Sequence, residues 1–360
     1  MSAVVREDVV ATHAQAAACA RPPLLVLDPL RAFLDAHGLG SGALRAEPLG
    51  EGHSNVTYLI ERDDLRVVLR RPPRPPIAPG THDMLREARI LRAIVPAGVR
   101  APVVLATCED ESVIGAAFYV TALLDGHVIA NTVPPPLDNA ADRRRIGLEL
   151  VDALAEVHAV DVRAAGLDGI GRPDGYLARQ LRRFAELAAR GATRTIPELE
   201  QVHRWLERSL PARSDATLVH GDFRLGNALF APGPPARLAG ILDWEMATVG
   251  DPLADVGYLL ATYARPGDRE NPMLALSGAT RAPGFPETGE LRARYEQRSG
   301  RSTAGLAFYE VLALWKAAIF LEVSWRRHLA GTTDDPFFAS LDEGVPLLAR
   351  EAWRRAGAAG

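Results

Sequence analysis

The sequence of 360 residues predicts an α+β protein of two lobes, a first lobe rich in strands and a second that is mostly helical. Up to residue 124, short apolar runs alternate with turn residues, as they do in strands and hairpins. After Asp125-Gly126, apolar residues recur at helical spacing. A chain of this length also favours two domains. We therefore expect a tail over 1–22, a first lobe over 23–124 and a second lobe over 125–360, with a ligand cleft between the lobes.

The first lobe is expected to hold two helices and a set of strands. Asp28-Pro29 supplies an N-cap and a first-turn proline, so a helix is expected to begin there. The proline-rich segment 72–80 excludes a helix or a central strand. Thr81 is then expected to cap a helix over 84–94. The expected strands cover 44–49, 56–61, 66–70, 103–107 and 117–124.

The second lobe is expected to be helical around one hairpin. Apolar residues from Ile146 to Val157 keep the helical period. Residues 231–235 form a turn by composition between two apolar runs, which predicts a β-hairpin over 228–243. Further helices are expected over 176–190, 198–210, 252–263 and 303–329.

The composition excludes several classes of protein. Lys316 is the only lysine, and no glycine-rich loop precedes it, which excludes a P-loop nucleotide site. A net charge of −4 argues against a nucleic-acid partner, because such proteins usually carry a basic excess. Cys19 and Cys108 form neither a zinc motif nor a disulfide framework, so a reducing compartment is expected.

A membrane partner is not expected either. The longest apolar stretch, 306–323, contains Glu310, Lys316 and Glu322. A charged side chain costs about 2.5–3.5 kcal/mol at the centre of a bilayer. We therefore expect this stretch to be a buried helix of a cytoplasmic protein.

The most informative stretch is His220-Gly221-Asp222, with Asn227 five residues later and Asp243 at the far end of the hairpin. Antiparallel pairing brings Asn227 and Asp243 to one end of the hairpin, and Asp222 lies in the loop that enters it. A carboxylate beside an amide oxygen is a hard ligand set that suits Mg²⁺. A surface turn rich in Asp and Asn is the alternative, but turn chemistry explains neither His220-Gly221 nor the apolar flanks.

This pattern resembles the core of the aminoglycoside phosphotransferase and choline kinase family, small-molecule kinases with a protein-kinase-like fold. The resemblance covers about residues 44–330 and implies a kinase that uses ATP and Mg²⁺ to phosphorylate a small hydroxyl compound. It implies Asp222 as the catalytic base, and Asn227 and Asp243 as the ligands of the metal ion. Phosphoryl transfer of this kind depends on positioning and charge neutralisation.

Several segments resemble a narrower branch, the kinase domains fused to acyl-CoA dehydrogenases. They are Leu242-Asp243-Trp244-Glu245, Gly250-Asp251-Pro252-Leu253-Ala254-Asp255, Phe223-Arg224 and His82-Asp83-Met84. This branch implies hydroxyacyl-CoA acceptors, whose phosphates arginines can bind. The broader family implies aminoglycosides or other antibiotics as alternative acceptors.

The nucleotide side of the site is also implied by the family. Two glycines in a turn let backbone N–H groups approach phosphates, and the loop after the first strand resembles the loop that covers ATP. A plain hairpin turn is the commoner interpretation of a G-x-G motif. The resemblance implies nucleotide contacts from this loop and from an adenine-pairing hinge near 121–125: Gly50, Gly52, Ser54, Asn55, Thr121 and Leu123.

The run Val67-Val68-Leu69-Arg70 takes the place of the kinase V-A-I-K strand. Strand alternation puts Val68 and Arg70 on one face. Val68 is then expected at the adenine and Arg70 at the α- and β-phosphates, with Glu87 as the ion-pair partner of Arg70. An exposed arginine on an edge strand is the plain alternative, and Arg71 is the alternative contact to the phosphates.

Arg224 lies two residues after Asp222. In serine/threonine protein kinases a lysine at this spacing contacts the transferred phosphate. We hypothesise that the Arg224 guanidinium neutralises charge on the γ-phosphate. A salt bridge within the loop is the alternative.

The remaining polar residues are expected to be structural. Asp251 is an N-cap, Asp255 is expected to brace the catalytic loop, and His158 is expected to be a packed core histidine. Two other classes of function stay open. A nucleotide-binding pseudokinase is disfavoured by the presence of Asp222, Asn227 and Asp243. A metal-dependent hydrolase using Asp222, Asp243 and Asp251 would need no nucleotide.

Overall fold

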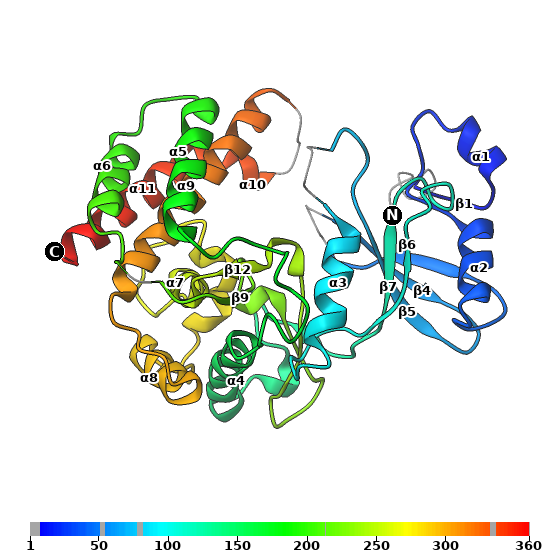
Figure 1. Cartoon of the computed structure of the whole chain (residues 1–360), viewed down its shortest axis with the longest axis horizontal. Helices are drawn as coiled ribbons and strands as arrows, with labels where there is room; N and C mark the ends of the chain where they lie inside the picture. Colours follow the sequence, from blue (N-terminus) through cyan, green and yellow to red (C-terminus); the bar gives the residue numbers. More distant parts are fainter. Residues whose placement is uncertain (1–7, 51–54, 78–81, 213, 332–335, 360) are drawn as a thin grey trace. The chain divides into compact units, whose positions relative to one another are not determined.

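The computed structural model describes residues 8–50, 55–77, 82–212, 214–331 and 336–359, and the chain divides into two compact units. The first unit combines the residues up to Pro96 with Ala101–Leu124. The second unit combines Ala97–Arg100 with the residues from Asp125 onward. The first unit carries an antiparallel sheet and the second is mostly helical, which confirms the α+β class (Figure 1).

The first unit is built on a five-stranded antiparallel sheet in the order β3-β4-β5-β7-β6. Each strand lies within two residues of its predicted bounds. The strands are β3 (Arg45–Pro48), β4 (Val56–Glu61), β5 (Arg66–Arg71), β6 (Val104–Cys108) and β7 (Phe118–Ala122).

One helix lies on each side of this sheet (Figure 1). Helix α2 (Leu27–Ala36) buries Leu30 and Leu34 in the same apolar core as Ile60 of β4 and Leu69 of β5. Helix α3 (Met84–Ile94) packs against β6 and β7. Because successive side chains of a strand point to opposite faces, β5 divides its residues between these two environments.

Two predicted helix starts are corrected. Helix α2 begins at Leu27, so Asp28 lies in its first turn, because Val26 is still extended and belongs to strand β2 (Leu25–Val26). Helix α3 is capped by Asp83, whose side chain accepts a hydrogen bond from Arg86 N. Thr81, the predicted cap, lies outside the described residues.

The predicted tail is also corrected in its described part. Strand β1 (Val9–Val10) pairs in parallel with β2. Helix α1 (His13–Ala18) follows it and begins with a capping box between Thr12 and Gln15. These local bonds give the segment the regular structure that its weak apolar pattern did not indicate.

The second unit is organised around α9, which packs against α5, α6, α7 and α11 (Figure 1). Helix α4 packs against α8. Helices α8, α10 and α11 were not predicted. The helices are α4 (Ala140–His158), α5 (Tyr176–Gly191), α6 (Pro197–Arg208), α7 (Pro252–Thr262), α8 (Thr288–Ser299), α9 (Leu306–Leu329), α10 (Pro336–Ala339) and α11 (Leu341–Ala358).

Two small sheets frame the central loops of this unit. Strands β10 (Ala228–Phe230) and β11 (Leu238–Ile241) form the predicted hairpin, and β8 (His127–Val128) pairs with the outer side of β10. Strands β9 (Thr217–Val219) and β12 (Thr248–Gly250) form an antiparallel pair. The stretch between β9 and β12 therefore leaves one small sheet, forms the hairpin and returns.

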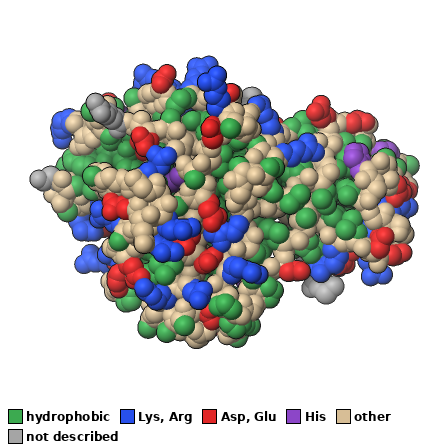
Figure 2. Space-filling model, turned by 60° about the horizontal axis from the view of Figure 1, so that its bottom comes forward, with side chains coloured by type: hydrophobic (Ala, Val, Ile, Leu, Met, Phe, Trp, Pro, Cys, Tyr) green, Lys and Arg blue, Asp and Glu red, His purple; other side chains and the backbone are tan. Residues whose placement is uncertain are grey.

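The surface carries charges of both signs. On the face drawn in Figure 2, arginine side chains are interspersed with aspartate and glutamate side chains. Within the described residues, no helix has both the length and the apolar character needed to cross a bilayer.

Candidate functional site

The loop after β9 is held in shape by its glycine and its histidine. Gly221 has φ +87°, and a Cβ at this position would lie 2.7 Å from the backbone oxygen of Met246. Any other residue would be strained here and would also clash. The His220 side chain is fully buried, and its Nε2 lies 2.9 Å from the backbone oxygen of Leu242. The loop is thereby tied to the residue that precedes Asp243.

Helix α7 holds the same loop through Asp255. The Asp255 carboxylate is buried and accepts hydrogen bonds from His220 N at 2.6 Å and Gly221 N at 2.8 Å. His158 Nε2 lies 3.2 Å from the same carboxylate, and its Nδ1 lies 2.8 Å from Tyr295 Oη. Burial alone would raise the pKa of Asp255, but the hydrogen bonds from His158 and Gly221 hold it below its ordinary value. Asp255 thus fixes the backbone immediately before Asp222.

The structure brings Asp222, Asn227 and Asp243 into one small region. Asn227 Nδ2 donates hydrogen bonds of 2.8 Å to the backbone oxygen and to Oδ2 of Asp222. Leu242 N donates to the backbone oxygen of Asn227 at 2.8 Å, continuing the ladder that pairs Ala228 with Ile241. Asp243 follows directly, so Asn227 and Asp243 lie at the same end of the hairpin.

Asp243 has an unusual backbone conformation. Its φ is +65° and its ψ is 67°, the left-handed region that residues other than glycine rarely occupy. It precedes a short 3₁₀ turn, Trp244–Met246, whose Trp244 side chain is buried. Such local strain collects at functional sites, where the surrounding structure holds it in place.

The donor set at this hairpin end fits a small, hard cation. Because Asn227 uses its amide nitrogen toward Asp222, its amide oxygen is the atom that remains for a metal ion. Asp243 would add a carboxylate. Within the described residues there is no group of three or more His, Cys, Asp or Glu side chains able to hold a metal. A set of two protein oxygens suits Mg²⁺, which completes its shell with phosphates and water.

Two further side chains reach Asp222. Arg224 Nε lies 3.5 Å from Asp222 Oδ2, so the salt bridge considered as the alternative role for Arg224 is present. Tyr258 of α7 interacts with Asp222, and burial followed by the Asp222 charge raises the pKa of Tyr258 well above its ordinary value. Tyr258 was not among the predicted site residues. The feature of the sequence that could have indicated Tyr258 is its spacing of three residues from Asp255, which puts both side chains on one face of the helix.

In the first unit, strand alternation separates the two candidate arginines. Arg70 points to the α3 side, where its Nε lies 3.3 Å from Oε2 of the buried Glu87. Arg71 points to the opposite, core side, and its guanidinium donates to the backbone oxygens of Leu24, Pro72 and Ile114. Burial lowers the pKa of Arg71 to about 10. The hydrogen bonds of the Arg71 guanidinium are thus made to backbone oxygens within the first unit.

The other predicted nucleotide contacts lie on strands β5 and β7, just after β7, and in the loop that begins at Gly50. Val68 pairs with Thr121 across β5 and β7, and Leu123 lies just beyond the end of β7. Gly50 has φ +80°, whereas Gly52 and Ser54 lie outside the described residues.

The Asn55 side chain is buried and contacts His82. Its Oδ1 lies 2.8 Å from His82 Nδ1, close to the start of helix α3. The Asn55 amide oxygen is therefore used in a contact within the protein.

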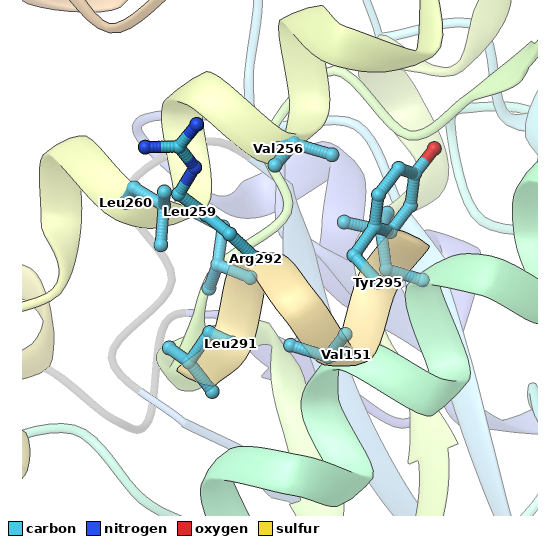
Figure 3. Close-up of a pocket in the computed structure, with 8 residues that line it drawn as sticks. Val151, Val256, Leu259, Leu260, Leu291, Arg292 and Tyr295 are labelled. Atoms are coloured by element: carbon cyan, nitrogen blue, oxygen red, sulfur yellow. The ribbon is translucent and has the colours of Figure 1, made fainter. Parts of the chain in front are cut away.

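A cavity in the second unit is too small to be a ligand site. Apolar side chains of α4, α7 and α8 line it, among them Val151, Val256 and Leu291 (Figure 3). Its volume is about 10 Å³. That volume is close to the minimum for one water molecule, so the cavity is a packing void.

The α+β fold is that of the protein-kinase-like phosphotransferases. The crystal structure of a Ralstonia eutropha protein, provisionally described as an aminoglycoside phosphotransferase, aligns with a TM-score of 0.77 and 30% identity. The alignment covers 92% of this chain and 98% of that one. The model of the phosphotransferase enzyme family matches residues 45–310, and the chain belongs to this family.

Curated relatives confirm the predicted resemblance to the narrower branch. The mouse acyl-CoA dehydrogenase family member 10 is 32% identical over 332 residues, which cover 90% of this chain and 30% of that protein. The chicken acyl-CoA dehydrogenase family member 11 is 33% identical over 298 residues, which cover 81% of this chain and 38% of that protein. The chain therefore spans about a third of the length of these relatives.

Proposed function

We propose that this protein transfers the γ-phosphate of ATP to a hydroxyl group of a small molecule. The observation that carries the proposal is the double hydrogen bond from Asn227 to Asp222 at the hairpin end that also holds Asp243. This arrangement combines one proton acceptor with two hard oxygen donors. A site of this composition suits phosphoryl transfer, which needs positioning and charge neutralisation.

In the proposed reaction, Asp222 orients the acceptor hydroxyl and takes its proton. The hydroxyl oxygen forms a bond to the γ-phosphorus, while the bond to the bridging oxygen breaks and ADP leaves. Asn227 and Asp243 would hold Mg²⁺, which supplies positive charge to the β- and γ-phosphate oxygens when bound. Tyr258 positions the Asp222 carboxylate, and Arg224, whose Nε lies 3.5 Å from that carboxylate, would neutralise charge on the γ-phosphate.

On the nucleotide side, we assign Arg70 to the α- and β-phosphates, with Glu87 holding its guanidinium. A guanidinium suits this role because it stays charged and can bind two phosphate oxygens at once. Val68 would line the adenine pocket. Backbone groups near Thr121 and Leu123 would pair with the adenine edge, and the loop from Gly50 to Asn55, including Gly52 and Ser54, would cover the phosphates.

For the acceptor we favour a hydroxyacyl-CoA. The support is the similarity to proteins named as acyl-CoA dehydrogenase family members. An acyl-CoA dehydrogenase acts on acyl-CoA, so a kinase similar to these proteins is expected to act on a hydroxylated acyl-CoA. An aminoglycoside or another antibiotic is the second candidate, supported by the name of the Ralstonia protein.

An acceptor panel with Mg·ATP tests the proposal. We suggest a 4-hydroxyacyl-CoA, an aminoglycoside, choline and an amino alcohol, with ADP release as the readout and Asp222→Asn as the control. Phosphorylation of the 4-hydroxyacyl-CoA above the control supports the favoured acceptor. Thermal stabilisation by Mg·ATP without turnover of any acceptor indicates a pseudokinase. Release of free CoA from the 4-hydroxyacyl-CoA in the absence of nucleotide, measured with a thiol reagent, indicates a metal-dependent hydrolase and overturns the proposal.

Replacing Arg224 tests its proposed role at the transferred phosphate. Arg224→Ala is expected to lower kcat by about 10²-fold or more, because positive charge is lost where transition-state charge develops. The KM for ATP should change far less. Steady-state kinetics in ATP provide the measurement. Equal effects on kcat and KM would indicate that Arg224 only stabilises the loop through its salt bridge with Asp222.

The neighbouring arginines of β5 form a matched pair of variants. Arg70→Gln is expected to raise the KM for ATP by about 10- to 100-fold, because a charged hydrogen bond to phosphate is lost. Glutamine still offers an N–H donor to Glu87. Arg71→Gln should leave the KM for ATP nearly unchanged and lower the free energy of unfolding by about 1–3 kcal/mol, because buried carbonyls lose their donor. Kinetics and urea unfolding of both variants decide the assignment, and the reverse pattern would give the phosphates to Arg71.

A further inference from the structure

Helix α9 carries three charged residues within its apolar stretch, and two of them are neutralised by neighbours. Glu310 Oε2 lies 2.6 Å from Arg355 Nη1. Glu322 Oε2 lies 3.2 Å from Arg194 Nη2, and Glu322 Oε1 accepts a hydrogen bond from the Thr193 backbone N–H. Lys316, the third, has no carboxylate within ion-pair distance in the part of the chain that the structure describes.

The surroundings of Lys316 make the missing counter-ion costly. Its side chain is half-buried, and its Nζ lies 4.8 Å from the ring centroid of Phe184 on α5. Arg183, the preceding residue of α5, also has no ion pair among the described residues. Burial, followed by the positive charge of Arg183, lowers the pKa of Lys316 to about 8, against the opposing effect of Asp255. A cation that is partly withdrawn from water, with the exposed Arg183 as a like charge, is stabilised by an anionic partner.

The position of Lys316 relates it to the proposed reaction. Helix α9 packs against α7, and α7 holds the loop before Asp222 through Asp255. Asp255 is also the carboxylate whose charge acts on Lys316. Phe320, one helical turn after Lys316 and so on the same face, is 61% exposed. The Lys316 ammonium thus lies beside the Phe184 ring, on a helix that packs against α7 and on a helix face that also carries the exposed Phe320.

We propose that Lys316, together with Arg183, binds an anionic group of the acceptor, and that Phe184 and Phe320 contact the apolar part that joins this anion to the reacting hydroxyl. The inference rests on the proposed function and narrows its substrate class to hydroxyl compounds that carry a carboxylate or a phosphate. A lysine supplies a compact charge with three donors, and its aliphatic stem can lie along the apolar surface. The anion is the counter-ion that the protein itself does not supply.

Kinetics with acceptors of different charge test this site. The probes are 4-hydroxypentanoyl-CoA, which carries phosphates, 4-hydroxypentanoate, which carries a carboxylate, and 1,4-pentanediol, which is neutral. Lys316→Met removes the charge at nearly constant length, and Lys316→Arg retains it. Lys316→Met is expected to lower the ratio of kcat/KM for the anionic acceptors to that for the diol by about 10- to 100-fold. Lys316→Arg should restore most of this ratio.

Arg183 has a matched control in the adjacent residue of the same helix. Arg183→Met is expected to lower the same ratio, whereas Arg182→Met, which removes an exposed arginine whose charge is not among those acting on Lys316, should not. A larger loss with 4-hydroxypentanoyl-CoA than with 4-hydroxypentanoate identifies the phosphates as the bound group, and the reverse identifies the carboxylate. An unchanged ratio in Lys316→Met overturns the inference.

A second measurement does not depend on turnover. Because the chain has one lysine, protein labelled with ¹³C-lysine gives a single Cε signal. Its titration midpoint is expected near pH 8 and should rise when 4-hydroxypentanoyl-CoA or 4-hydroxypentanoate is added, relative to ATP alone. A response without phosphate transfer retains the anion site and rejects the proposed kinase activity. Transfer without any response rejects the anion site and retains the kinase activity.

Discussion

Asp222→Asn is expected to lower kcat by about 10²- to 10⁴-fold, the range that a positioned general base contributes. The substitution keeps the shape of the side chain, and its amide oxygen can still accept the hydrogen bond from Asn227 Nδ2. What the amide cannot do is take the proton of the acceptor hydroxyl. The loss should therefore appear in kcat, while the KM for ATP changes little.

Two further measurements make this result specific to the reaction. Asp168→Asn serves as a matched control, because Asp168 is exposed and has no ion pair in the described structure of the second unit. Thermal stabilisation of Asp222→Asn by Mg·ATP reports whether the nucleotide still binds. If Asp222→Asn retained activity within about threefold of the wild type, another group would have to accept the proton, and the assignment of Asp222 would be wrong.

The second large effect is on stability. Asp255→Ala is expected to lower the free energy of unfolding by about 3–5 kcal/mol, as removal of one partner from a buried charged network does. The His220 and Gly221 backbone N–H groups lose their acceptor, and so does His158. Each buried donor left without a partner costs about 1–3 kcal/mol. Urea unfolding followed by circular dichroism measures the change, with Asp168→Ala as the exposed control.

The pH dependence of this effect follows from the lowered pKa of Asp255. The folded protein binds the proton of Asp255 less readily than the unfolded chain, whose ordinary pKa is 3.8. The contribution of Asp255 is therefore fully present above that value and is lost as the pH falls through the folded pKa. The difference in unfolding free energy between wild type and Asp255→Ala should stay constant from about pH 7 to about pH 5 and shrink as the pH falls below 3.8. A difference that stayed constant or grew below pH 3.8 would contradict the hydrogen bonding described for the Asp255 carboxylate.

The sequence predicted an element correctly where a short segment showed the apolar periodicity or the turn residues of that element. Strand β4 has the predicted bounds, and the hairpin of β10 and β11 forms about the predicted turn. Helix α8 was missed because only two of its residues, Leu291 and Tyr295, are buried. A helix that is otherwise polar shows too little apolar periodicity, and it is stabilised by packing against α4.

The sequence by itself predicted that Asn227 and Asp243 lie close together. Two antiparallel strands joined by a short turn bring the start of the first strand beside the end of the second. The sequence also determined that Arg70 and Arg71 point to opposite faces of their strand. The tertiary structure decided which face meets Glu87 and which meets the core carbonyls.

The tertiary structure alone placed Tyr258 beside Asp222, and it alone left Lys316 without a carboxylate among the described residues. Pairing and periodicity act between residues close in the chain, so they can be read from the sequence. Contacts between distant segments depend on how helices and sheets pack, and one sequence does not specify that packing to the precision of a hydrogen bond.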